Sequence, residues 1–155
     1  ALPPLIDALD NASADYSMND TLWILYGFDA DARPAIPALL RLLERPGKTS
    51  RGAVINVLRN TSDPAVVPPL RQQLRDPDRD VWRAAAAALG ELGDRESFEE
   101  IAARLPSPAE ENDAHLVLTL LNSLHQLDPA RARPHVRRAR NDPLMHNVHQ
   151  HLPKP

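Results

Sequence analysis

Three histidines near the carboxyl end of the chain are the residues best suited to hold a metal. They are His146, His149 and His151, and the first two share a helical face at the i, i+3 spacing that can chelate zinc or nickel. Asp142 is the only carboxylate nearby, so an acidic group that would orient these ligands is not evident. The alternative is a solvated polar cap. We expect no metal and no cofactor, and these histidines are the candidate ligands if a metal does bind.

A run of arginines before those histidines is the candidate for phosphate binding. It consists of Arg131, Arg133, Arg137, Arg138 and Arg140. On a helix these side chains spread around more than one face, which also suits a soluble end cap whose arginines favour a helix C-terminus. The net charge of −3 gives no general attraction to nucleic acid. We therefore do not expect nucleic acid to be the partner.

Sequence signatures of catalysis are missing. The chain has no Gly-x-Ser-x-Gly or His-Glu-x-x-His motif and no glycine-rich phosphate loop. It has no cysteine, which excludes a disulfide, a thiolate zinc site and a cysteine nucleophile. Ser123 and His125 are two residues apart, so on a helix they do not face each other. We expect a non-catalytic protein.

The elements that position these residues recur with a period of about 33 residues. Leu25, Leu58, Leu89 and Leu124 are spaced 33, 31 and 35 apart, each near the end of an apolar-periodic segment. Asp-Pro steps recur at about twice that distance. Asp followed by Pro is a helix-start signal, because Asp caps the helix and Pro fits its first position. The Asp-Pro steps are 63–64, 76–77, 128–129 and 142–143.

These registers predict ten short helices in pairs, and strand signals are absent. The predicted helices are 2–9, 18–28, 34–44, 50–60, 65–75, 79–90, 96–104, 110–126, 131–140 and 143–151. The predicted fold class is all-α, an α-solenoid of about five antiparallel helix pairs in a single domain of residues 1–155. Its repeats are expected at about 1–31, 32–62, 63–94, 95–128 and 129–155.

Residues 76–94 resemble the HEAT-like repeats of phycobilisome-lyase-type proteins, whose second helix reads Val-Arg-x-x-Ala-Ala-x-Ala-Leu-Gly-x-Leu-Gly-Asp. Val81, Ala85, Ala86, Ala88, Leu89, Gly90, Leu92, Gly93 and Asp94 match this pattern. Trp82 stands where the family has an Arg that helps to tie neighbouring turns together, and Arg51 keeps that position in the second repeat. The resemblance implies a HEAT-like superhelix whose second helices line a concave side. It also implies two alternative functions: a chromophore-lyase-type enzyme or enzyme subunit, and a nucleic-acid-binding HEAT protein.

When the repeats are aligned, their variable positions on the concave side lie at equivalent places in successive second helices. These positions form the candidate binding face. They are Asp20, Trp23, Asn56, Arg83, Thr119 and Asn122. An exposed Trp beside Asn combines large contact area with adaptable hydrogen bonding. The alternative is that Trp23 packs under an irregular first repeat. We expect a protein-binding scaffold or adaptor whose partner the sequence leaves open.

Charge is distributed unevenly along the chain. Residues 1–32 carry six Asp and no Lys or Arg, whereas residues 131–155 carry five Arg, one Lys and one Asp. Stacked repeats would put these segments at opposite ends, which predicts a salt-sensitive head-to-tail self-association. We expect no membrane span. The chain starts at Ala1, which fits a mature exported protein or a fragment of a longer array, so the compartment stays open between cytoplasm and export.

Overall fold

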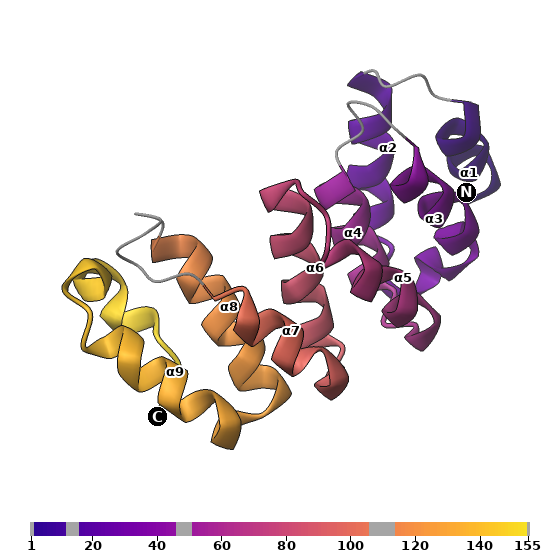
Figure 1. Ribbon diagram of the computed structural model, residues 1–155. Coiled ribbons are helices and arrows are strands. Elements are labelled where there is room, and N and C mark those ends of the chain that lie inside the picture. Colours follow the sequence, from indigo (N-terminus) through magenta and orange to yellow (C-terminus); the bar gives the residue numbers. More distant parts are fainter. Residues whose placement is uncertain (1, 12–15, 46–50, 106–113, 155) are drawn as a thin grey trace. The chain divides into compact units, whose positions relative to one another are not determined.

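The computed structural model describes residues 2–11, 16–45, 51–105 and 114–154, and every regular element in these ranges is helical (Figure 1). The all-α prediction is confirmed. The α-helices are α1 (Leu2–Asn11), α2 (Tyr16–Tyr26), α3 (Ile36–Glu44), α4 (Arg51–Asn60), α5 (Val67–Gln73), α6 (Arg79–Glu91), α7 (Phe98–Ala103), α8 (Ala114–Leu127) and α9 (Pro129–Arg140). The 3₁₀ segments are η1 (Asp29–Ala35), η2 (Pro64–Val66), η3 (Arg95–Ser97) and η4 (Pro143–His151).

Aspartates begin several of these elements, as the Asp-Pro spacing predicts. Asp63 accepts a hydrogen bond from the backbone N–H of Ala65 at 2.9 Å, and η2 starts at the next residue. Asp128 accepts from the N–H of Arg131 at 3.1 Å, with Pro129 as the first residue of α9. Both carboxylates thereby satisfy a donor that the first turn would otherwise leave free.

The Asp76-Pro77 step does not itself begin a helix, and α6 begins at Arg79, where the predicted helix 79–90 begins. The carboxylate of Asp76 instead accepts the N–H of Asp78 at 2.8 Å in a turn and forms an ion pair with Arg51. Asp78 lies directly before α6 and accepts the N–H of Asp80 at 2.9 Å. Asp76 therefore holds the turn that precedes α6 and does not cap the helix.

Several further segments differ from the predicted helices. Residues 143–151 form the 3₁₀ segment η4 rather than an α-helix. Short 3₁₀ turns also precede α3, α5 and α7, where one continuous helix was expected. Part of the predicted helix 110–126 lies outside the described residues, and α8 accounts for the rest from Ala114 onward.

The chain divides into two compact units, Ala1–Ala84 and Ala85–Pro155. In the first unit α1 packs on α2 and α3, and α4 packs on α2 and α3. Apolar residues at i, i+3 and i+4 positions form the contacts, as in α3, where Leu39, Leu42 and Leu43 are buried. Arg41 ties α3 to α1 through both carboxylate oxygens of Asp10 at 2.8 Å.

In the second unit α8 packs on α7, α9 and η4, and α9 packs on η4. On α6, Ala85, Ala88 and Leu89 are fully buried. Gly90 follows them, and a Cβ built there would lie 2.8 Å from the Cα of Ser123 on α8. Helices α6 and α8 therefore approach more closely at this point than a residue with a side chain allows. The boundaries of the five predicted repeats stay a prediction.

Candidate functional site

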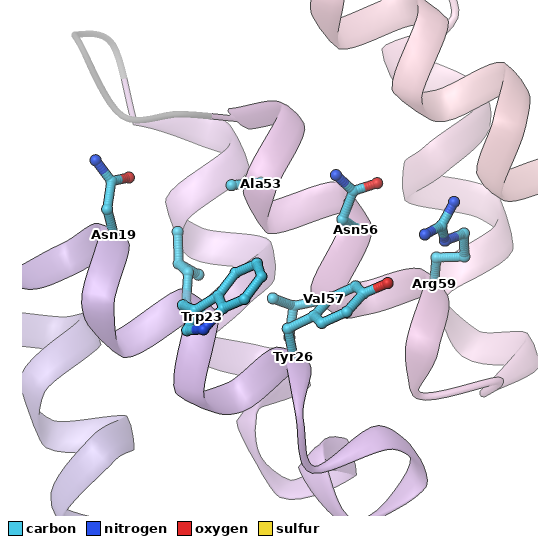
Figure 2. A pocket seen from close by; sticks show the side chains of 8 residues that line it. Asn19, Trp23, Tyr26, Ala53, Asn56, Val57 and Arg59 are labelled. Carbon is cyan, nitrogen blue, oxygen red and sulfur yellow. The ribbon is translucent and has the colours of Figure 1, made fainter.

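A groove in the first unit lies between α2 and α4, with a volume of about 450 Å³ (Figure 2). We call it the aromatic groove. Most of its lining atoms are apolar, with polar side chains at both ends and on the α4 wall. Its lining residues are Asn19, Leu22, Trp23, Tyr26, Ala53, Asn56, Val57 and Arg59.

Trp23 and Tyr26 form the α2 wall of the aromatic groove. Their rings stack with centroids 6.1 Å apart and planes inclined by 12°. The core-facing side of α2 is occupied by Leu22 and Leu25, which are fully buried, so Trp23 is turned outward and is 77% exposed. The alternative in which Trp23 packs inside the first repeat is therefore wrong. A large indole that stays exposed on a folded helix is a feature of surfaces that bind partners.

Side chains of α4 form the opposite wall and tie the two walls together. Asn60, at the end of α4, donates from Nδ2 to the carbonyl of Tyr26 at 3.2 Å and to Oδ1 of Asp29 at 3.3 Å. Asn56 and Arg59 line the groove from α4 (Figure 2). Because Asn60 bonds to the backbone of α2, the spacing between the two walls is fixed by the fold itself.

A second groove lies at the equivalent register in the second unit, with a volume of about 470 Å³. We call it the polar groove. Ala87 is at the position equivalent to Trp23, 64 residues later in the sequence, and Asn122 is at the position equivalent to Asn56, 66 residues later. Two of its polar side chains already donate within α8: Thr119 donates to the carbonyl of His115 at 2.9 Å, and Ser123 donates to the carbonyl of Thr119 at 3.0 Å. Its lining residues are Ala87, Glu91, Thr119, Asn122, Ser123, His125, Gln126 and Pro153.

Four of the six predicted binding residues fall in these grooves. Trp23 and Asn56 line the aromatic groove, and Thr119 and Asn122 line the polar groove. Asp20 is exposed on α2 but is not among the lining residues. Arg83 is half-buried on α6 and pairs with Asp80 at 3.2 Å. That all six bind one partner stays a prediction.

Sequence reasoning missed Asn19, Tyr26 and Arg59 in the aromatic groove. The signal that would have found them is helical spacing: Asn19 and Tyr26 are four residues before and three residues after Trp23, and Arg59 is three residues after Asn56. Side chains so spaced share a helix face. Aligning repeats selects equivalent positions on different helices and passes over these neighbours on the same helix.

The candidate metal ligands do not converge. The rings of His146 and His149 meet edge to face with centroids 5.5 Å apart, while His151 contacts Gln150 at 3.2 Å. Within the ranges that the structure describes, no three His, Asp or Glu side chains are grouped so as to hold a metal ion.

Two of the five arginines in the basic run are engaged within the second unit. Arg131 lies 4.2 Å over the ring of Phe98 and pairs with Glu99. Arg140 donates to the carbonyl of Pro153 at 3.0 Å and so ties α9 to the end of the chain. The remaining three, Arg133, Arg137 and Arg138, are exposed on α9.

A comparison with known protein families concerns the helical fold of the chain. No helix in the described part of the chain has the length and apolar character needed to cross a membrane. Comparison with curated proteins finds no match. The family model described as HEAT repeats matches residues 2–90 and, in a second overlapping match, residues 36–122. Because every regular element in the described ranges is helical and the family model matches most of the sequence, the chain belongs to the HEAT repeat family.

Proposed function

We propose that this protein is a non-catalytic scaffold that binds a protein partner, with the aromatic groove as its principal contact. The observation that carries the proposal is Trp23, which is 77% exposed, stacked on Tyr26 and placed at a groove whose other wall offers Asn56 and Arg59. Trp, Tyr and Arg are the residues most often responsible for binding energy at protein interfaces. HEAT repeats also supply a rigid helical frame on which such side chains are held in place.

The groove chemistry supports binding rather than catalysis. Its lining residues offer no carboxylate, imidazole, thiol or aliphatic hydroxyl that would act as nucleophile or general base. They offer instead a flat aromatic surface and two carboxamides, each of which donates and accepts hydrogen bonds. Such groups recognise a peptide backbone and an apolar side chain without reacting with them.

Capture from the source organism with matched bait variants tests this proposal. The partner should be retained by wild type and by Ile24→Ala, and lost by Trp23→Ala. Ile24 is the right control, because it is the next residue on α2 and is 48% exposed, yet it does not line the groove.

Truncating a central interface Trp costs about 2 kcal/mol or more, which corresponds to roughly 30-fold in the dissociation constant. Trp23→Ala should leave the melting temperature close to that of wild type, because the side chain is exposed. A partner that binds Trp23→Ala and wild type equally would refute the assignment of the aromatic groove.

A further inference from the structure

The polar groove of the second unit repeats one wall of the aromatic groove position by position. Each α4 residue that lines the aromatic groove has a counterpart 66 positions later, on α8, that lines the polar groove. On α6, in contrast, Ala87 stands at the position equivalent to Trp23. The second unit therefore keeps the wall of a groove but lacks the aromatic surface. The paired residues are Ala53 and Thr119, Asn56 and Asn122, Val57 and Ser123, and Arg59 and His125.

The end of the chain supplies a further lining residue of the polar groove. Pro153 lines the groove together with residues of α6 and α8. It belongs to residues 152–154, which follow η4 and are not helical, and which we call the C-terminal tail. Leu152 is 5% exposed and lies in an apolar cluster with residues of α8, α9 and η4. The tail is thus anchored beside the groove by one buried leucine.

Arg140, the last residue of α9, holds the backbone of the tail. Its Nη2 donates to the carbonyl of Pro153 at 3.0 Å and to that of Leu152 at 3.4 Å. Hydrogen bonds to the backbone together with seats for individual side chains are how proteins bind extended peptides. The Nε of Arg140 is buried and has no acceptor among the described residues. The tail therefore leaves unused a buried donor that another segment could satisfy.

We propose that α8, α9 and the polar groove form a binding site for an extended Leu-Pro segment of a protein partner, and that the C-terminal tail occupies this site in the free protein. The tail defines the chemistry of the ligand: a leucine in the apolar cluster, a proline at the groove and backbone carbonyls on Arg140. A partner segment with this pattern displaces the tail, so its apparent affinity is set by competition with the tail. The inference goes beyond the proposed function, because the site lies in the second unit and does not involve Trp23.

Fluorescence anisotropy of a labelled peptide tests the site. The peptide is Gln-His-Leu-Pro-Lys-Pro, the sequence of residues 150–155, with a fluorophore at its amino end and an amide at its carboxyl end. The decisive protein variant is Leu152→Ala, which removes the anchor of the tail and keeps Arg140 and every lining residue of the groove. The peptide should bind this variant at least about 10-fold more tightly than wild type, because loss of a buried leucine side chain weakens the competing tail by more than that factor.

His151→Ala is the matched protein control, because His151 is the neighbour of Leu152 but is exposed, and this variant should bind the peptide as wild type does. Peptides that carry Leu152→Ala or Pro153→Ala should each bind the Leu152→Ala protein several-fold more weakly than the parent peptide. Arg140→Gln, added to the Leu152→Ala protein, should remove most of the gain, because the donor to the backbone carbonyls is lost.

If the Leu152→Ala protein fails to fold, the Pro153→Ala protein replaces it. Pro153 is half-buried and lies outside the apolar cluster, so its truncation weakens the tail without opening the core, and the peptide should again bind more tightly than to wild type.

Equal affinity of the peptide for wild type and for the tail variants overturns the inference, as does the absence of binding to all of them. A Leu152→Ala peptide that binds as well as the parent peptide also overturns it. Dimers of wild type that Leu152→Ala abolishes would assign the site to the tail of a second copy and would overturn the assignment of a partner. The capture experiment with Trp23→Ala decides the proposed function separately, because it concerns the aromatic groove alone.

Discussion

Replacing Gly90 with alanine should destabilise the protein, although alanine is the better helix former. Gly90 lies inside α6, where this change ordinarily stabilises by about 1 kcal/mol. Here the added Cβ would lie 2.8 Å from Cα of Ser123 and 2.9 Å from Oε1 of Gln126. The glutamine side chain can rotate away. The Ser123 Cα belongs to the backbone of α8 and moves only if that helix moves.

The net effect is the difference between these two terms. Overpacking costs about 1–3 kcal/mol, and a contact with the backbone belongs in the upper half of that range. After subtraction of the helix-propensity gain, we expect Gly90→Ala to lower the free energy of unfolding by about 1–2 kcal/mol. Urea denaturation followed by circular dichroism measures this as a lower midpoint at unchanged slope.

Gly52→Ala is the matched control for this experiment. Gly52 also lies inside a helix, α4, but the nearest atom to a built Cβ is the carbonyl oxygen of Asp80 at 3.8 Å, an ordinary contact. We expect this variant to be stabilised by up to about 1 kcal/mol. If Gly90→Ala proves as stable as Gly52→Ala, the close approach of α6 and α8 is not a property of the protein.

Three further predictions concern the core, an ion pair and self-association. Ala88→Glu puts an unpaired charge at a fully buried position of α6 and should cost several kcal/mol; an unchanged melting temperature would contradict the packing. Arg51→Gln and Asp76→Asn each break the same half-buried ion pair, and each should lower the free energy of unfolding by about 2 kcal/mol. The double variant should lose little more than either single variant, and additive losses in a double-mutant cycle would show that the two residues act independently. Attraction between the acidic residues 1–32 and the basic residues 131–155 of two copies should give self-association at low salt that fades at several hundred millimolar, where screening is strong; identical sedimentation coefficients at both salt concentrations would rule it out.

The helical repeat was predictable from the sequence, because a buried apolar residue recurs at a regular spacing. The four leucines that defined the period, Leu25, Leu58, Leu89 and Leu124, are all fully buried. Each is packed between neighbouring helices, so the requirement for an apolar residue of similar size returns with every repeat. The role of each aspartate was less predictable, because a carboxylate such as that of Asp76 can cap a helix or bind an arginine, and sequence spacing does not distinguish the two.

The sequence left two alternatives for Trp23, an exposed side chain or a packed one, for a different reason. Leu22, Trp23, Ile24 and Leu25 are four consecutive apolar residues, and a helix cannot turn all four toward one core. The phase of α2 relative to α4 decides that Leu22 and Leu25 are buried while Trp23 and Ile24 face outward. That phase is set by contacts with other helices, which the sequence of α2 alone does not contain.

The close approach of α6 and α8 at Gly90 limits whether the aromatic pair of the first unit could be engineered into the second unit. Ala87 has the register of Trp23 and lines the polar groove, so an engineer could exchange it for an aromatic residue. Gly90 has the register of Tyr26, and there even a methyl group meets the backbone of α8. The stacked pair therefore cannot be copied into the second unit by swapping side chains. A redesign would first have to widen the gap between α6 and α8.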